Sequence, residues 1–199
     1  MLNIPDILVL ASLGIFGLLF LGRTILLQAQ GVKVWVIGAS AKKVSEKILE
    51  SLLFPVLILW CLAVILTALH GGDKYFIFRI LLEARWLKIT GLFLCYGGLL
   101  LFLSALLSFG QAWRIGIDEN NSPALVTTGI FKYSRNPIFL FMDLYFAGIA
   151  LIYPGLFFIL AALLVLPGLH LQILREEKFL QNKFGQEYSA YKASARRYL

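Results

Sequence analysis

Long apolar runs separated by short polar segments dominate the chain. The first run extends from Ile4 to about Leu27, the second from about Ile48 to Leu69, and the third from Trp86 to about Phe109. Each is close to the roughly 20 residues that a helix needs to cross the hydrocarbon core of a bilayer. We therefore predict three membrane-spanning helices within residues 1–109.

A fourth apolar stretch, from Pro137 to Leu174, is too long for one span. Tyr153-Pro154-Gly155 interrupts it with a turn signal, so two short helices in a tight hairpin fit it best. The predicted fold is all-α: a polytopic membrane protein with about five transmembrane helices and a C-terminal helical tail. We expect one domain over residues 1–199, in which residues 110–199 hold the hairpin, the tail and most of the polar chemistry.

Composition agrees with a membrane protein. Hydrophobic residues make up 60% of the chain and charged residues 15%, and the mean hydropathy is +0.84, whereas a soluble domain is about half apolar and a quarter charged. The net charge of +7 then indicates loops near anionic lipid rather than nucleic acid. Cys61 and Cys95 lie in apolar runs, and His70 and His170 lack companions at ligand spacing, so no metal is expected.

Lysine and arginine predict the orientation. The segment from Lys33 to Lys47 has four such residues, the tail beyond Leu174 has six, and the hairpin turn has none nearby. We expect the N-terminus outside and the C-terminus in the cytoplasm, in the inner membrane if the source is bacterial. The polar segments 111–136 and 172–199 then face the cytoplasm together at the two ends of the hairpin.

Three features of these segments are candidates for chemistry. Asn136 and Pro137 favour a helix start whose free N–H groups suit an anion; the alternative is a capped helix with a snorkelling Arg135. Glu176 and Glu177 point about 100° apart on a helix, so one faces the bundle or both line a solvated helix exit. Within the hairpin, Asp143 is a functional candidate or the buried partner of a Tyr, Trp or Arg.

The tail contains Phe184-Gly185-Gln186-Glu187-Tyr188-Ser189-Ala190-Tyr191. Gly185 suits the end of one helix, and a second short helix follows. Tyr188 and Tyr191 share a face of that helix. We expect an interfacial amphipathic helix or a lid over a site between the two polar segments.

Two sequence patterns together resemble a known family. The first is Leu125-Val126-x-x-Gly129-Ile130-Phe131-x-Tyr133-x-Arg135-Asn136-Pro137-Ile138-Phe139. The second is Glu176-Glu177-x-x-Leu180-x-x-x-Phe184-Gly185-x-Glu187-Tyr188-x-x-Tyr191, followed by Arg196-Arg197. In this order around a helical hairpin they resemble the isoprenylcysteine carboxyl methyltransferases and the related phospholipid methyltransferases. This chain departs from the family pattern at three positions: it has Asn136, Phe139 and Gln172 where the pattern has His, Tyr and Arg, respectively.

The resemblance implies a methyltransferase that uses S-adenosylmethionine and a lipid-like acceptor entering from the bilayer, by default the carboxylate of a prenylated cysteine. It implies catalytic roles for Arg135, Arg175 and Glu176, and an acceptor-facing position for Gln111, Trp113 and Gln172. The implied cofactor-binding residues are Leu125, Val126, Gly129, Ile130, Phe131, Tyr133, Arg135, Asn136, Pro137, Phe139, Glu176 and Glu177.

Two other functions fit part of this pattern. Membrane reductases of sterol-like or isoprenoid double bonds end in a similar Arg-x-Pro and acidic-tail pattern, and they would bind NADPH. A non-enzymatic membrane scaffold would keep the helices and need neither cofactor. The sequence does not indicate an oligomeric state.

Overall fold

The computed structural model describes residues 2–32, 34, 44–71, 76–113 and 124–199, and in these ranges the regular elements are helices. Within them, the structure has six α-helices and three single-turn 3₁₀ helices. The α-helices are α1 (Ile4–Ala29), α2 (Val44–His70), α3 (Arg85–Phe109), α4 (Pro137–Ile152), α5 (Leu156–Phe184) and α6 (Gln186–Ser194). The 3₁₀ helices are η2 (Phe76–Phe78), η3 (Gly110–Ala112) and η4 (Gly129–Lys132).

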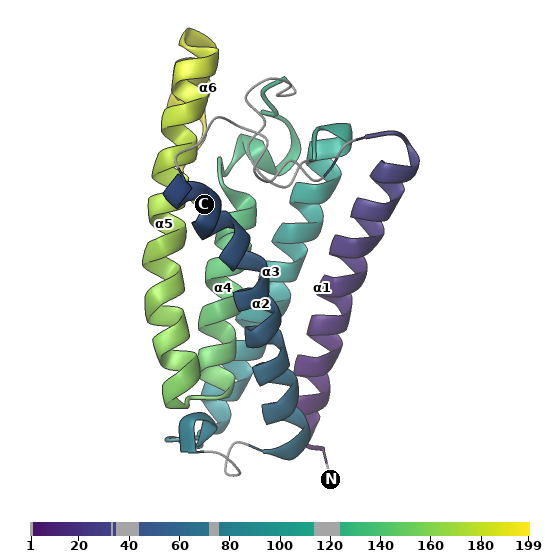
Figure 1. Cartoon of the computed structure of the whole chain (residues 1–199), viewed down its shortest axis with the longest axis vertical. Helices are drawn as coiled ribbons and strands as arrows, with labels where there is room; N and C mark the ends of the chain where they lie inside the picture. Colours follow the sequence, from purple (N-terminus) through teal and green to yellow (C-terminus); the bar gives the residue numbers. More distant parts are fainter. Residues whose placement is uncertain (1, 33, 35–43, 72–75, 114–123) are drawn as a thin grey trace.

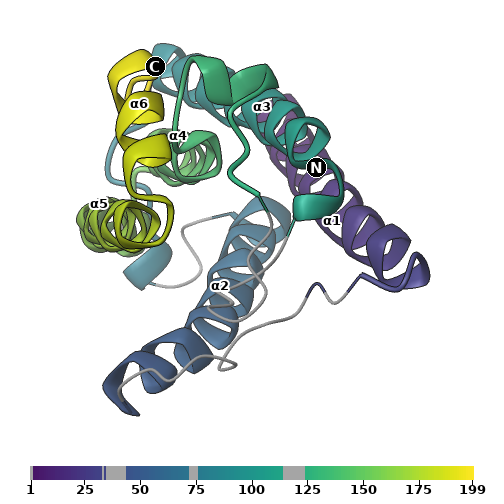
Figure 2. The same ribbon diagram turned by 90° about the horizontal axis from the view of Figure 1, so that it is seen from above.

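The helices α1 to α5 form one bundle in which successive helices run in opposite directions (Figure 1). The helix α4 packs against α3 on one side and α5 on the other, and α1 packs against α3 (Figure 2). The N-terminus lies at the end of the bundle that holds the α4–α5 turn. The segment before α4, the helix α6 and the C-terminus gather at the opposite end, which we call the polar end.

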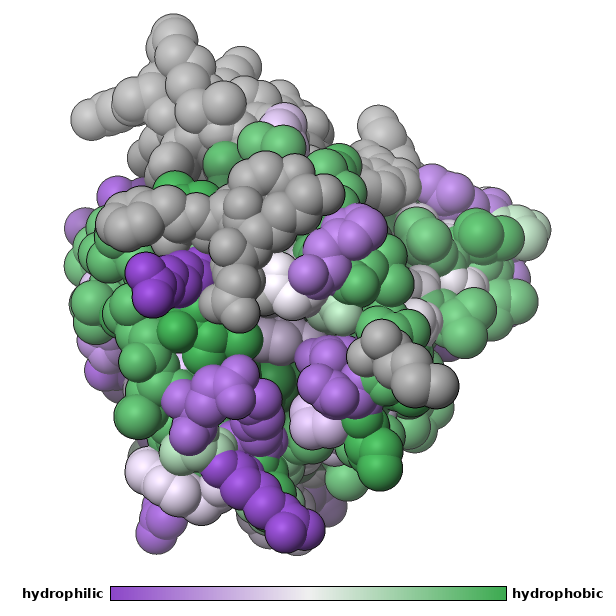
Figure 3. Space-filling model, turned by 90° about the horizontal axis from the view of Figure 1, so that it is seen from below, coloured by the Kyte–Doolittle hydropathy of each residue, from purple (hydrophilic) through white to green (hydrophobic). Residues whose placement is uncertain are grey.

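The predicted elements agree with the structure. Three helices, α1, α3 with η3, and α5, are long and apolar enough to cross a membrane, and α4 and the described part of α2 from Pro55 are shorter apolar helices. Only 11% of the most apolar window of α1 is buried inside the protein, so most of its apolar side chains are free to face lipid. Seen from below, hydrophilic side chains gather on the end of the bundle and hydrophobic ones follow its rim (Figure 3).

The helix α5 differs from the prediction in its length. The apolar run ends at Leu174, but the helix continues without a break to Phe184 and ends at Gly185, whose φ of 52° suits glycine. The two glutamates therefore lie within a continuous helix rather than at its exit. As a result, their directions are fixed by the same helix that is buried in the bundle.

Two glycines bring α3 and α4 into close contact. A Cβ atom added to Gly91 would lie 2.5 Å from the carbonyl oxygen of Gly148, and one added to Gly148 would lie 2.7 Å from Sγ of Cys95. Small residues at such a crossing are the usual way in which membrane helices approach closely, because lipid supplies no hydrophobic drive between them. This crossing fixes α4 against α3 below the polar end.

Aromatic side chains fill the bundle between α1, α3 and α4. The rings of Phe102 and Phe141 stack with centroids 4.8 Å apart, and Ser12 of α1 hydrogen-bonds the Tyr145 hydroxyl at 2.8 Å. At the far end, the Leu81 N–H donates to the carbonyl of Pro154 at 2.9 Å. The α4–α5 turn is thereby tied to the segment before α3.

Candidate functional site

A single glycine shapes the segment that leads into α4. Gly129 has a φ of 63°, in the left-handed region, and a Cβ atom there would overlap the Ser108 hydroxyl of α3 and lie 2.9 Å from its Cβ. The same hydroxyl accepts a hydrogen bond from the Ile130 N–H at 3.2 Å and donates to the Ser104 carbonyl at 2.8 Å. The η4 turn is therefore seated directly on the end of α3.

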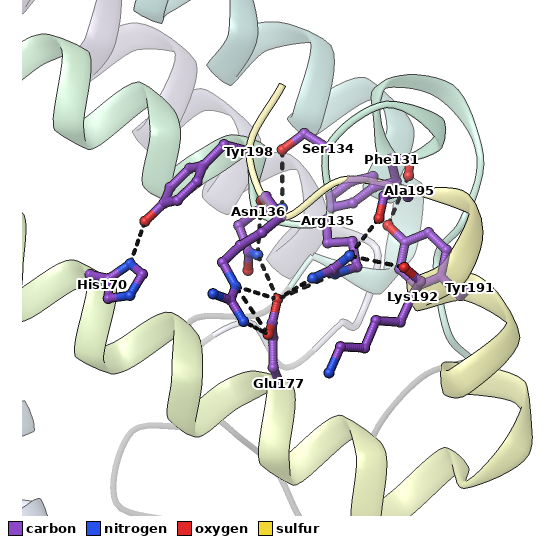
Figure 4. A network of polar contacts seen from close by, with 11 residues as sticks. Phe131, Ser134, Arg135, Asn136, His170, Glu177, Tyr191, Lys192, Ala195 and Tyr198 are labelled. Atoms are coloured by element: carbon purple, nitrogen blue, oxygen red, sulfur yellow. Dashed lines mark hydrogen bonds and ion pairs between the residues drawn. The ribbon is translucent and has the colours of Figure 1, made fainter.

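At the other end of this segment, Arg135 pairs with Glu177 of α5. The Arg135 Nη2 lies 2.8 Å from Oε1 of Glu177, and each side chain is only 7% exposed. The Arg135 Nε donates to the same oxygen at 3.2 Å, so two N–H groups of one guanidinium form a fork on a single carboxylate oxygen (Figure 4). A charged pair this well buried needs such geometry to offset the loss of hydration.

Two further side chains converge on Glu177. Arg197 of the tail donates through Nη2 to Oε2 at 2.8 Å, and Asn136 donates through Nδ2 to Oε1 at 3.5 Å. The hydrogen bond to Glu177 raises the pKa of Arg197 above its ordinary value, so this guanidinium stays charged. One carboxylate thus balances two guanidinium groups, and the cluster retains one positive charge.

The tail also pairs with the segment before α4 through its backbone. The Arg135 N–H donates to the Arg196 carbonyl at 2.8 Å, and the Arg196 N–H donates to the Tyr133 carbonyl at 3.3 Å. The Arg135 side chain donates through Nη1 to the Lys192 and Ala195 carbonyls (Figure 4). The Arg135 side chain is consequently buried and bonded to both α5 and the tail. The alternative, in which Arg135 snorkels towards water, is therefore wrong.

Asn136 starts α4 as predicted, but it does not cap the helix with its side chain. It occupies the N-cap position before Pro137, and no side-chain cap hydrogen bond forms. Its amide instead donates to Glu177 and to the Arg197 carbonyl, the latter at 3.1 Å. The Asn136 side chain is therefore oriented by its hydrogen bonds to the buried carboxylate and to the tail, and not by the helix N-terminus.

Beside the charged cluster, α6 closes over an apolar cluster formed by Phe131, Tyr188, Tyr191 and Ala195. The Tyr191 hydroxyl donates to the Phe131 carbonyl at 2.8 Å. Burial raises the pKa of Tyr191 to about 12, so the phenol keeps the proton that it donates. The two tyrosines share a face as predicted, and that face is packed on the protein.

A cavity of about 400 Å³ opens at the polar end, next to the seat of η4. Apolar and hydroxyl side chains both line it, so it suits a ligand with both kinds of surface. Its lining residues are Ser108, Gln111, Ala112, Ala124, Leu125, Val126, Thr127 and Thr128.

The two glutamates have different surroundings, as their spacing predicts. Glu177 is buried in the charged cluster, whereas Glu176 is half-buried. The Gln172 amide donates to Glu176 at 3.3 Å, one helical turn away. Arg175 is exposed on the same helix, so the structure joins Arg135 to Glu177 and places Glu176 with Gln172.

The remaining predicted residues divide between the cavity and the core. Leu125, Val126 and Gln111 line the cavity. Phe131 and Trp113 are buried, and Phe131 lies edge-on to Phe109 with centroids 4.7 Å apart. Others of the predicted set are more open: Tyr133 is exposed, and Ile130 and Phe139 are half-buried.

Several residues of the site had no predicted role. Arg197 closes the charged cluster, and Ser108 seats Gly129. His170 of α5 contacts Tyr198 of the tail through Nδ1 at 2.7 Å (Figure 4). Only Arg197 had a signal in the sequence, because it belongs to the Arg196-Arg197 pair of the second pattern. In the described ranges, no three His, Cys, Asp or Glu side chains form a possible metal site.

Comparison with known proteins gives one result at the level of family. No curated protein matches the chain significantly. The model of the phospholipid methyltransferase family matches residues 86–187, just over half of the 199 residues. The match runs from the start of α3 into α6 and includes both predicted patterns up to Glu187, which confirms the resemblance. The chain therefore belongs to the phospholipid methyltransferase family and is a membrane methyltransferase that acts on lipid-like substrates.

Proposed function

We propose that the protein transfers a methyl group from S-adenosylmethionine to an amphiphilic acceptor that enters from the bilayer. The observation that carries the proposal is the cavity beside Leu125 and Val126, which adjoins the segment locked by the Arg135–Glu177 pair. The family supplies the reaction class, and these residues supply a place for the methyl donor at the polar end.

The donor set of the site fits S-adenosylmethionine. The charged cluster keeps one net positive charge, and the N-terminus of α4 adds free N–H groups, so both suit the carboxylate of the cofactor. Glu176 offers a half-buried carboxylate for its ammonium or ribose hydroxyls. The mixed lining of the cavity suits the adenosine part. When bound, the cofactor supplies an electrophilic methyl group on sulfonium.

The protein itself then holds the reactants, aligns them and excludes water. Arg135 is committed to Glu177 and to tail carbonyls, so in this proposal it acts as a positioning residue. In this proposal Gln172, which hydrogen-bonds Glu176, and the exposed Arg175 face the acceptor. Alignment of reactants and exclusion of water account for most of the rate enhancement in transfers of this type.

The proposal includes a topology. The five helices α1 to α5 span the bilayer, with the N-terminus outside and the polar end in the cytoplasm, where S-adenosylmethionine is available. The described helix bounds and the positive charge of the tail support this arrangement. The part of the chain between Lys33 and Lys47 that predicted the inside face lies largely outside the described residues.

Calorimetry on the full-length protein in detergent tests the proposal. We expect S-adenosylmethionine and S-adenosylhomocysteine to bind to the wild-type protein. Ala124→Trp fills part of the cavity and should weaken binding at least about tenfold, whereas Ala193→Trp makes the same change on the exposed side of α6 and should leave it unchanged. Both alanines are exposed, so neither change disturbs the core.

Two results would reject the proposal. One is the absence of binding heat for either compound in a protein that still melts cooperatively. The other is tight binding of NADPH in their place, which would favour the reductase. Equal binding by wild type and Ala124→Trp would mean that the protein uses the cofactor but binds it outside this cavity.

A further inference from the structure

A second cavity lies at the end of the bundle opposite the polar end. It has a volume of about 530 Å³ and lies between the first turns of α1 and α3, with Ile4 and Leu8 on one side and Lys88 and Leu92 on the other. The two helices pack against each other, and both begin at this end (Figure 1). The Tyr96 hydroxyl donates to the Leu8 carbonyl at 2.9 Å, so the two walls of the cavity are tied together.

This cavity is too far from the one at the polar end for a single ligand to occupy both. Lys88 lines the first cavity and Ser108 lines the other, and both residues lie on α3. Ser108 is about 30 Å further along the helix axis, at 1.5 Å per residue. The ligand that fits the second cavity is therefore not the methyl donor.

Polar and apolar residues of the second cavity are separated along the helix axis. The charged ones, Glu83, Arg85 and Lys88, belong to the segment before α3 and to its first turn. Apolar side chains continue the walls into the bundle, and two of them, Ile4 and Ile89, are 73% and 57% exposed. Hydrophobic side chains also border the hydrophilic ones on this end of the molecule (Figure 3). This arrangement fits an amphiphile whose head lies at the membrane surface and whose chain lies along the helices.

The ion pair at the mouth of the cavity is weak. The Lys88 Nζ lies 3.9 Å from Oε1 of Glu83, and the Glu83 side chain is 73% exposed whereas that of Lys88 is only 24% exposed. An exposed pair at this distance contributes little to stability. An anionic ligand is therefore able to replace Glu83 beside the Lys88 ammonium at small cost.

The other charges of this end also favour an anion. Arg85 is exposed and has no ion-pair partner among the described residues, and a guanidinium group binds phosphate through two N–H groups at once. The nearby carboxylate of Asp6 already accepts hydrogen bonds from the Tyr153 hydroxyl and the Asn3 N–H. Basic residues at this end run against the charge bias of the proposed topology, and an anionic ligand gives them a role.

We infer that this cavity binds an anionic phospholipid from the leaflet on its own side of the membrane. The phosphate group lies between Lys88 and Arg85, and an acyl chain lies against Ile4, Leu8 and Ile89. Because the lipid contacts both α1 and α3, its binding stabilises their association. The inference requires only that these helices lie in a bilayer, and it is independent of the proposed methyl transfer.

The test compares two short-chain lipids with the same acyl chains, a phosphatidylglycerol and a phosphatidylcholine, by calorimetry on the full-length protein in detergent. We expect the wild-type protein to bind the phosphatidylglycerol about tenfold more tightly, the contribution of one charged hydrogen bond. The difference should shrink as the salt concentration rises. Lys88→Gln should lose most of this preference, whereas Lys132→Gln, the same change at an exposed position of the polar end, should keep it.

A second pair of variants tests the apolar wall. Ile4→Trp fills part of the cavity from a position that is 73% exposed, and Leu18→Trp makes a similar change elsewhere on α1 at a position that is 77% exposed. Only Ile4→Trp should weaken the binding of phosphatidylglycerol. Neither position belongs to the core, so this pair decides even if Lys88→Gln does not fold.

Four results would overturn the inference. The wild-type protein could bind both lipids equally, or Lys88→Gln could keep the full preference. Ile4→Trp could bind phosphatidylglycerol as tightly as Leu18→Trp does. Finally, glycerol phosphate, which has the anionic group but no acyl chain, could bind as tightly as the lipid, which would mean that the apolar wall takes no part.

Discussion

The guanidinium group of Arg135 and the carboxylate of Glu177 form a buried fork, with Nη2 and Oε1 2.8 Å apart and both side chains 7% exposed. One partner directly precedes α4 and the other lies on α5. Arg197 of the tail completes the arrangement. The segment before α4, the helix α5 and the tail are thus held by one carboxylate.

Removing that carboxylate should destabilise the protein strongly. Glu177→Gln leaves two guanidinium groups without their counter-charge, and breaking a buried pair in this way costs about 3–5 kcal/mol. We expect a lower thermal midpoint in detergent and faster proteolysis of the tail. Glu187→Gln, at an exposed position of α6, is the matched control. Equal melting of the two variants would show that the cluster does not stabilise the fold.

Gly129→Ala should be more damaging than Gly110→Ala. Both glycines have positive φ, 63° and 52°, but only at Gly129 does an added Cβ meet the Ser108 side chain, whereas nothing lies within 4 Å at Gly110. Each alanine costs about 1–3 kcal/mol for its backbone conformation, and Gly129→Ala also displaces η4. Thermal melts give the difference. Adding Ser108→Gly to Gly129→Ala should recover only the steric part.

The crossing of α3 and α4 should not tolerate a larger residue. Gly148→Val places a branched side chain where an added Cβ already lies 2.7 Å from Sγ of Cys95, and overpacking of this kind costs about 1–3 kcal/mol or more. Gly97→Val, on α3 with nothing within 4 Å, controls for the loss of a helical glycine. The yield of monodisperse protein in detergent measures both. Comparable yields would mean that the two helices can separate without loss of the fold.

Alkaline conditions should weaken the contact between α6 and η4. Burial raises the pKa of Tyr191 to about 12, whereas the phenol of an unfolded chain titrates near 10. The folded protein therefore binds a proton that the unfolded chain loses between these values, so the stability from this group is present below about pH 10 and falls as the pH rises towards 12. Tyr191→Phe removes the titration. Its melting temperature should fall less between pH 9.5 and about 11 than that of wild type, and parallel curves would contradict this assignment.

The sequence predicted the helices well because their signal is local and strong. Apolar runs of the length of a span placed α1, α2 and α3, and Tyr153-Pro154-Gly155 placed the turn between α4 and α5. The apolar run alone ended at Leu174, since the length of such a run reports where lipid contact ends, not where the helix ends. Gly185 marked the true end of α5.

The pairing of the site residues could not be read from spacing. The sequence identified Arg135, Glu177 and the Arg196-Arg197 pair as candidates. It could not pair them, because Arg135 and Arg197 lie 42 and 20 residues from Glu177 along the chain. The choice of Glu177 over Glu176 depends on the rotation of α5 against α4. Likewise, Asn136 was predicted as a cap from its local sequence, and a contact made only in the folded protein redirected its side chain.

The position of Arg135 before the hairpin and of Glu177 after it has a consequence for biogenesis. These two residues can meet only when both ends of the hairpin emerge on the same face of the bilayer. If α5 failed to return across the membrane, Arg135 and Glu177 would lie on opposite faces of the bilayer, and each would lack its charge partner. In the proposed topology the Arg135–Glu177 ion pair therefore forms only after both helices of the hairpin have crossed the bilayer, and a wrongly inserted chain would lack this part of the proposed methyl-donor site.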